Sequence, residues 1–378
     1  MRLLILLFSI LSSISVFANP TVRSMRIDPS YFYSLYPNLS TLEIAEKVVA
    51  TAKAANVNTL YIYAYNSTYG SFYTTNYSMT TIESGYGQLD IFGTILNTAK
   101  SNGLTVIANM PVNDFKNVWD LKPSWRSKKR NGTDYIPAAD TYLLSAWHPY
   151  FRTWLAGFYK DFLARYPAVD AIEAVEPMVD YFWNKDSDYN PSSNSEFKLR
   201  YPAAYLGGST WLRFRAQGLT NLVASLSQVA HAAGKKSAVV QTWAVNADGS
   251  LFTYQSMRDG MGFDFNAILN LTGAYKVDFI SAEFMWQQWK AEYGSAIFNP
   301  DWTRSASISF LNFVANRSFP IIHLEISPFY GSVTSVTPTP LDLQNSIQAI
   351  ADITPGIDVY DYNQIESLSA WSAFATWN

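Results

Sequence analysis

The chain has 378 residues, of which 48% are hydrophobic and 15% are charged, a composition that supports a large core and excludes a mainly disordered chain. The formal net charge of −3 argues against a nucleic-acid partner, because such proteins carry strongly basic surfaces. Cysteine is absent, which excludes disulfides, a thiol nucleophile and a lipidated cysteine anchor.

The N-terminal segment has the pattern of a secretory signal peptide. Arg2 precedes a short apolar run that ends in "VFA", so we expect residues 1–18 to be a signal peptide cleaved after Ala18. The run is too short for a membrane span, and no later segment is apolar for long enough to form one. We therefore expect a mature chain of residues 19–378 that is exported, either periplasmic or secreted, with no membrane span.

Eight short β-rich runs follow along the chain. They occupy residues 24–28, 58–65, 104–112, 169–176, 236–245, 277–286, 320–327 and 356–363. Helical patterns separate them, and the first of these opens with Ser40 and Glu43 at the spacing of a capping box. Strand alternating with helix eight times predicts a single α/β domain, a (β/α)8 barrel. A doubly wound open sheet is the alternative that the count of eight disfavours.

The longest interruptions follow the second, third and fourth strands, at about residues 66–88, 113–147 and 177–207. They are rich in Tyr, Trp, Asn, Ser and Asp. In a (β/α)8 barrel these loops emerge at the C-terminal face, where such proteins carry their sites.

Alternation within the strands predicts which side chains point into the barrel. Glu325 near the end of 320–327, Glu283 in 277–286 and Asp28 in 24–28 all fall on the inward side. The last strand offers Asp358, Tyr360 and Tyr362 as its inward set, with Asp361 as the alternative. Carboxylates from several strands are thus expected to meet at one mouth.

The fourth strand, "VDAIEAVEPMVDY", contains two glutamates of opposite parity. Glu173 is in mid-strand, and we favour a structural role in which it pairs with Arg26 inside the barrel. Glu176 lies where Pro177 ends the strand, so it is expected at the rim, over the cleft.

Two carboxylates in one cleft suit the cleavage of a glycosidic bond, in which one protonates the leaving oxygen and the other attacks the anomeric carbon or activates water. Glu176 and Glu325 are the predicted catalytic pair, with Glu176 as general acid/base and Glu325 as nucleophile or base. Other chemistries fit less well. The three histidines show no metal-ligand spacing, and neither a phosphate-binding loop nor a nucleophile elbow is present, so no cofactor or metal is expected.

Several further residues are predicted to bind the substrate. Asp28 and Glu283 are candidates for binding amino or hydroxyl groups. Aromatic faces cover the apolar face of a sugar ring, and many aromatics lie at or just past strand ends. The full set of substrate-binding candidates is Asp28, Tyr63, Asn109, Trp243, Glu283, Trp286, Tyr330 and Tyr362.

The chain resembles the C-terminal glycoside hydrolase domain of the bacterial periplasmic proteins that deacetylate and cleave poly-β-1,6-N-acetylglucosamine. The resemblance runs from about Ser24 to Trp371 and rests on "SMRIDPSYFY", "VNTLYIYAY", "VIANMPV", "HPYFRTWLAGFYKDFLARYPAVDAI", "TWLRFRAQGLTNLVASLSQVA" and "IIHLEIS". It implies a (β/α)8 barrel with an acidic cleft that hydrolyses a partly deacetylated glucosamine polymer.

By position, the resemblance puts the family's site acids on Asp28, Glu176 and Glu325. The family typically carries adjacent aspartates after the fourth strand, where this chain has Glu176-Pro177. That ending is more similar to the retaining hydrolases of clan A, in which the fourth-strand Glu is the acid/base and the seventh-strand Glu is the nucleophile.

The function expected from the sequence is hydrolysis of a polysaccharide, with a glucosamine-containing exopolymer as the implied substrate and exopolysaccharide machinery as the implied partner. The alternative is a barrel that binds polysaccharide without cutting it, in export or matrix assembly. A metal-dependent hydrolase is a third and weaker alternative.

Overall fold

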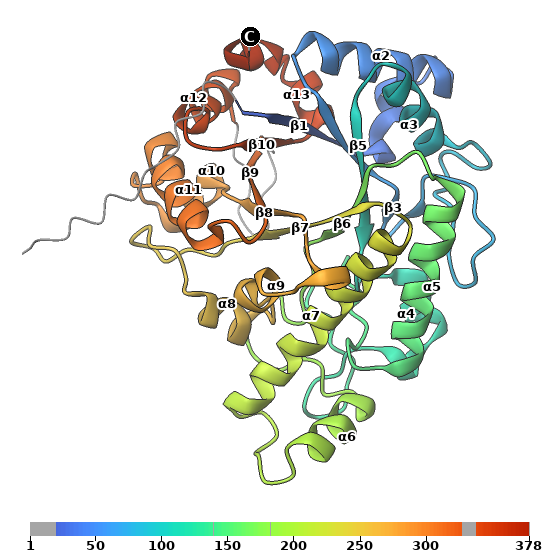
Figure 1. The fold of residues 1–378 in the computed structure, drawn as a ribbon, viewed down its shortest axis with the longest axis vertical. Helices are drawn as coiled ribbons and strands as arrows, with labels where there is room; N and C mark the ends of the chain where they lie inside the picture. The colour runs from blue at the N-terminus through green and yellow to red at the C-terminus, as the bar shows by residue number, and fades with distance from the viewer. Residues whose placement is uncertain (1–19, 139, 182, 327–337, 378) are drawn as a thin grey trace, which may run out of the picture.

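The computed structural model describes residues 20–377 apart from 139, 182 and 327–337, so the expected signal peptide lies outside the described residues. Within that part of the chain, eight parallel strands close into a barrel in the order β1-β10-β9-β8-β7-β6-β5-β2 (Figure 1). The barrel strands are β1 (Val22–Ile27), β2 (Thr59–Tyr63), β5 (Thr105–Pro111), β6 (Ala171–Val175), β7 (Lys236–Thr242), β8 (Phe279–Glu283), β9 (Phe319–Glu325) and β10 (Gly356–Tyr360). The predicted (β/α)8 barrel is confirmed.

Helices surround the barrel and cover the outward faces of its strands (Figure 1). The longer ones are α2 (Thr41–Ala54), α3 (Ile91–Ser101), α5 (Pro149–Arg165), α6 (Pro191–Arg200), α7 (Ser209–Ala232), α11 (Pro300–Val314) and α12 (Pro340–Ile350). The shorter ones are α1 (Phe32–Leu35), α4 (Lys116–Leu121), α8 (Tyr254–Gly260), α9 (Phe265–Leu269), α10 (Trp286–Tyr293) and α13 (Tyr362–Ser367). The 3₁₀ turns are η1 (Pro29–Tyr31), η2 (Pro123–Trp125), η3 (Gly273–Tyr275) and η4 (Ala370–Trp377).

Local sequence signals fix the ends of these helices. Helix α2 begins with the predicted capping box, in which the Ser40 side chain accepts from the Glu43 N–H and the Glu43 carboxylate accepts from the Ser40 N–H. Gly103 lies just after α3 with φ +76°, a left-handed conformation that glycine adopts without strain. These ends set where each strand starts, and hence which side chains reach the mouth.

The barrel interior is layered. Its floor is a small apolar cluster separate from the main core, formed by Tyr61, Ile107, Ala171, Ala238 and Ile321. The main core lies between the strands and the surrounding helices. Above the floor the inward side chains become charged, so the barrel changes from apolar to acidic towards the C-terminal ends of its strands.

The long loops after the second, third and fourth barrel strands build structure of their own. The loop after β2 contains a two-stranded ribbon, β3 (Tyr65–Asn66) and β4 (Gly70–Ser71). Helix α6 and the start of α7 extend away from the barrel, at the bottom of Figure 1. They enclose a second core of Trp147, Tyr189, Phe197, Trp211, Leu212 and Phe214.

Candidate active site

Carboxylates gather at the C-terminal ends of the barrel strands. Glu283 and Glu325 are the last residues of β8 and β9, Glu176 directly follows β6, and Asp28 and Asp361 directly follow β1 and β10. Because all these strands are parallel, their ends meet at one mouth. The structure therefore brings together the acids whose convergence the strand alternation predicts.

The mouth acids influence one another electrostatically. Burial, followed by the charges of Glu176 and Asp361, raises the pKa of the Glu325 carboxyl to about 8. Burial, followed by the charge of Glu176, raises the pKa of Glu283 well above its usual range. At neutral pH the Glu325 carboxyl therefore holds a proton, which a general acid requires.

Glu176 is set apart from these two acids by its exposure and its backbone. Its side chain is exposed, whereas Glu325 is half-buried. Its φ is +39°, a conformation that costs free energy in a residue with a side chain, and its N–H donates to the Val240 carbonyl at 3.0 Å. Pro177 follows, and its carbonyl accepts from the Gln241 side chain at 2.8 Å. The strand end is thus held in the turn that puts Glu176 at the rim.

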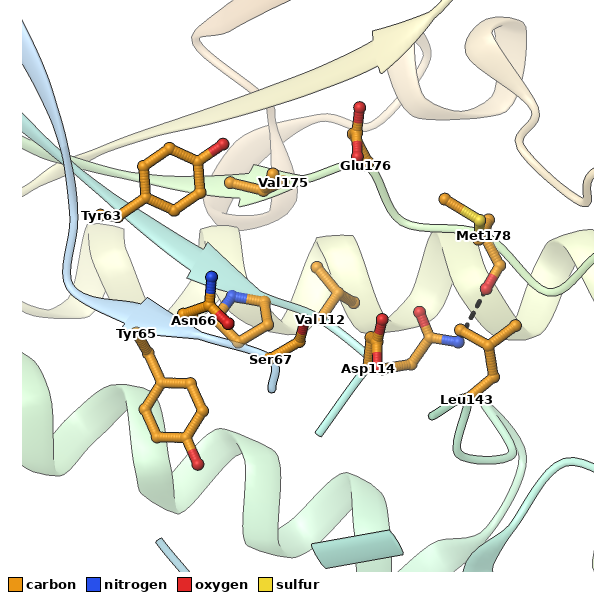
Figure 2. Close-up of a pocket in the computed structure, with 12 residues that line it drawn as sticks. Tyr63, Tyr65, Asn66, Ser67, Val112, Asp114, Leu143, Val175, Glu176 and Met178 are labelled. Atoms are coloured by element: carbon orange, nitrogen blue, oxygen red, sulfur yellow. Dashed lines mark hydrogen bonds between the residues drawn. The ribbon is translucent and has the colours of Figure 1, made fainter. Parts of the chain in front are cut away.

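A pocket opens beside Glu176 (Figure 2). Its lining comes from the ends of β2, β5 and β6 and the loops after them and comprises Tyr63, Tyr65, Asn66, Ser67, Pro111, Val112, Asn113, Asp114, Leu143, Val175, Glu176 and Met178. The wall is held by the Asn113 amide, which donates to the Met178 carbonyl at 2.8 Å. Of the expected site residues, Tyr63 and Glu176 thus line one pocket.

Asp114 in this pocket is an acid that the sequence analysis does not identify. Its carboxylate accepts from the Tyr142 N–H at 2.8 Å. Burial, and then the charge of Glu176, raises the pKa of Asp114 to about 7. It follows β5 in an irregular loop, where strand alternation gives no direction for a side chain.

A layer of paired charges lies below the mouth. Arg26 forms ion pairs with Glu173 at 2.7 Å and with Asp358 at 2.6 Å, and all three side chains are almost completely buried. The predicted structural role of Glu173 is thereby confirmed. Asn109 belongs to the same layer: in the orientation that satisfies its amide, it donates to Glu173 Oε2 and accepts from Arg26 Nη1, each at 3.0 Å.

Asn109 is therefore corrected from a substrate ligand to a member of this buried layer, because its whole side chain is enclosed and used by Arg26 and Glu173. Asp28, by contrast, lies at the mouth as expected. One of its carboxylate oxygens accepts from both the N–H and the hydroxyl of Ser30. Burial raises the pKa of Asp28.

Three expected aromatic platforms are packed into the protein instead. Trp243 is buried with its ring stacked 4.4 Å from Phe265, and its N–H donates to the Phe252 carbonyl. Trp286 is buried, and its N–H donates to the Ser346 hydroxyl. These two rings are not free to cover a sugar.

Tyr362 is the third of these aromatics. It is fully buried, and its hydroxyl is 3.0 Å from that of Tyr36. The fourth expected platform, Tyr330, lies outside the described residues. Tyr63 thus remains the expected aromatic that lines the pocket.

Exposed tyrosines occur instead on the loops around the mouth. Tyr31 ends η1, which follows β1 after Asp28, and Tyr69 lies between β3 and β4; they are 52% and 55% exposed. Burial, followed by the charges of Asp28 and Tyr69, raises the pKa of Tyr31, so these groups are near one another. Tyr181, on the loop after β6, is also exposed, and burial and then Glu176 raise its pKa.

The raised pKa of Glu325 predicts a pH-dependent stability. A carboxyl whose pKa rises from 4.5 to about 8 on folding contributes most to stability below pH 4.5, and that contribution is lost as the pH rises towards 8. Glu325→Gln stays uncharged, so its Tm relative to wild type should be higher at pH 8 than at pH 5 by about 2–4 °C. Thermal unfolding at the two pH values measures this. Glu46→Gln, at an exposed position on α2, is the control. If the Tm difference between Glu325→Gln and the wild type is the same at pH 5 and pH 8, the electrostatic account is contradicted.

In the described ranges, no group of three or more His, Asp and Glu side chains is arranged to hold a metal ion. Within the same ranges, no helix has the length and apolar character to cross a membrane.

An eight-stranded parallel barrel with several carboxylates at its C-terminal mouth has the fold and the type of site found in glycoside hydrolases. The family model described as glycosyl hydrolase-like 10 matches residues 36–248. The chain belongs to this glycosyl hydrolase-like 10 family. No curated protein sequence matches the chain.

Solved structures with the same fold include the PgaB (BpsB) glycoside hydrolase domain from Bordetella bronchiseptica. It aligns over 95% of this chain and 99% of that domain, with 13% identity and a TM-score of 0.67. A β-galactosidase from Rahnella sp. R3 (12% identity, TM-score 0.63) and α-L-fucosidase isoenzyme 2 from Paenibacillus thiaminolyticus (11%, 0.59) align over 96% and 94% of this chain. The chain spans 56% and 48% of those two proteins. At these identities the likeness shows that the chains share the (β/α)8 barrel fold.

Proposed function

We propose that the protein is an exported glycoside hydrolase that cleaves a polysaccharide, with Glu176 and Glu325 as its catalytic carboxylates. The observation that supports this most is the contrast between the two groups. Glu325 is half-buried with a pKa raised to about 8, while Glu176 is exposed at the rim beside a pocket. Neighbouring carboxylates whose environments differ in this way supply an acid and a base at one pH.

The electrostatics favour a division of roles opposite to the one that resemblance to clan A implies. Glu325 holds its proton at neutral pH, so it can protonate the leaving oxygen as the bond breaks. Glu176, exposed to water, then serves as nucleophile or base. Asp28 and Tyr63 are the proposed contacts for the sugar's polar groups.

The proposed substrate is a glucosamine-containing exopolysaccharide. Support comes from the excess of acids at the mouth, since an acidic cleft attracts a polymer that carries free amino groups. The signal-peptide pattern of residues 1–18 supports an exported, periplasmic or secreted location, where such polymers occur.

The test is to incubate the mature protein with a panel of polysaccharides that includes partly deacetylated β-1,6-linked glucosamine polymer, and to measure new reducing ends. We expect release from at least one amino-sugar polymer. Binding to the polymers without any new reducing ends would favour the other function, a barrel that holds polysaccharide for export or matrix assembly.

Tyr31 is the proposed sugar platform at the first-strand side of the mouth. Tyr31→Ala should raise KM for the polymer about 5- to 10-fold, the loss expected when one exposed aromatic face no longer covers a sugar ring. The matched control is Tyr205→Ala, which removes a ring that is 71% exposed on the extension between α6 and α7. Equal KM values for Tyr31→Ala and the wild type would remove Tyr31 from the binding surface.

A further inference from the structure

The proposed reaction gives no role to Glu283, His323 or Asp358. They come from the neighbouring strands β8, β9 and β10 and form one row, because Glu283 is in register with His323 and His323 with Asp358. All three are at least nine-tenths buried. These side chains thus form a continuous row of buried titratable groups that starts at the mouth and runs inward.

The inner end of the row fixes the tautomer of the imidazole. His323 Nδ1 lies 2.7 Å from Asp358 Oδ2. Two lone pairs would repel at this distance, so Nδ1 carries the hydrogen and donates it to Asp358. Arg26 Nε also lies 3.1 Å from His323 Nδ1, but it donates its hydrogen to the same Asp358 oxygen, at 2.6 Å.

The same contacts keep the Asp358 carboxyl group ionised. Burial acts to raise its pKa, but Arg26 and His323 outweigh burial and lower the pKa of Asp358 to about 2. Asp358 is therefore ionised throughout the working range. An ionised partner at Nδ1 orients the ring and stabilises it when it becomes an imidazolium.

The outer end of the row faces Glu283. With Nδ1 protonated, His323 Nε2 is an unprotonated acceptor in the neutral ring, and it lies 4.0 Å from Glu283 Oε1. That separation is longer than a hydrogen bond, so a small movement of either side chain must bring the two atoms together for the proton to pass. The other oxygen of Glu283 accepts from the Thr242 hydroxyl, which leaves Oε1 for the ring.

We propose that Glu283, His323 and Asp358 form a proton relay, in which one proton is shared between Glu283 Oε1 and His323 Nε2. When the proton moves inward, the O–H bond of Glu283 breaks, an N–H bond forms at Nε2, and the net charge of the row is unchanged. Glu283 then presents a carboxylate to the mouth, while Asp358 holds the imidazolium. No other reactant is consumed.

The surroundings favour the proton on Glu283 over His323. Burial lowers the pKa of His323, and burial and then Glu176 raise the pKa of Glu283. The other charged and titratable groups near the row are Arg26 from β1, Tyr61 and Tyr63 from β2, Glu173 from β6 and Glu176 just after it, Glu325 from β9 and Tyr360 from β10.

Positive charge at the mouth shifts this balance, because a cation beside Glu283 favours its carboxylate form. In the proposed hydrolysis, such charge arises on the sugar ring as the bond breaks. The role of the relay in the reaction therefore rests on the proposed function. The relay makes Glu283 negative when the sugar becomes positive, and leaves Glu283 neutral at other times.

The test needs no substrate, so its failure is distinct from failure of the proposed hydrolase activity. The chain has three histidines, which makes ¹⁵N-labelled imidazole signals assignable, and the pH titration of His323 is compared in the wild type and in Glu283→Gln. A glutamine can neither give a proton nor become an anion. A shared proton should give His323 Nε2 in the wild type a ¹⁵N signal between the neutral and the imidazolium values near neutral pH, whereas His323 in Glu283→Gln should show the neutral value there.

His231 is the built-in control: its Nε2 lies 2.8 Å from Asp278 Oδ2, at the opposite end of β8 from Glu283, so its imidazole signals should be the same in both proteins. If Glu283→Gln does not fold, Thr242→Val removes the hydroxyl that favours the Glu283 carboxylate and should shift His323 in the same direction by less. Identical titration of His323 in the wild type and the folded variant would overturn the relay.

Discussion

Glu325→Gln is expected to lower kcat for the polymer by about 10²–10⁴-fold, the range that general acid catalysis contributes. The amide cannot protonate the leaving oxygen. Glu176→Gln, which removes the proposed nucleophile or base, should lower kcat at least as much, because an amide can neither attack the anomeric carbon nor take a proton from water. Steady-state kinetics on the polymer found to release reducing ends measures both losses.

The leaving group separates the two roles. An aryl glycoside with a dinitrophenolate leaving group needs no protonation, so Glu325→Gln should keep much more of its activity on this substrate than on the polymer. Glu176→Gln should lose activity on both substrates. If the pattern is reversed, the roles are exchanged within the same pair, and full activity of both variants would remove the pair from the mechanism.

Arg26→Met is expected to destabilise the protein by about 3–5 kcal/mol, the cost of breaking a buried ion pair by removing one partner. Glu173 and Asp358 would be left buried at the centre of the barrel without their common cation. Urea unfolding followed by tryptophan fluorescence measures the loss.

The matched control is Arg304→Met. Arg304 pairs with Asp352 at 2.5 Å, but these side chains are 36% and 51% exposed, and such surface pairs contribute only about 0–1 kcal/mol. The combined variant Arg26→Met, Glu173→Gln and Asp358→Asn should recover part of the lost stability, because it removes the stranded charges as well. Equal stabilities for Arg26→Met and Arg304→Met would contradict the structural role of the buried layer.

Strand alternation made much of the barrel predictable. The eight β-rich runs match the eight barrel strands, the inward placement of Arg26 follows from strand alternation, and that of Glu173 is predicted from its mid-strand position as the partner of Arg26. The reason is physical: in a closed parallel barrel every second side chain must point inward, and the ends of all strands lie at one face.

Strand alternation does not predict the direction of side chains beyond the ends of the strands. Trp243 follows the last residue of β7, Trp286 opens α10 and Tyr362 opens α13, so all three turn into the packing between elements. Tyr31 and Asp114 reach the mouth from irregular turns whose course depends on tertiary contacts. The left-handed backbone of Glu176, at φ +39°, likewise depends on its bond to β7.

The most direct measurement is hydrolysis of the amino-sugar polymer in H₂¹⁸O, followed by mass spectrometry of the fragments. The wild type should place one ¹⁸O atom at C1 of each new reducing end, while a variant carrying both Glu176→Gln and Glu325→Gln should produce no labelled ends yet still bind the polymer. Polymer that binds to the wild type and stays intact and unlabelled, or equal labelling by the double variant, would contradict the account.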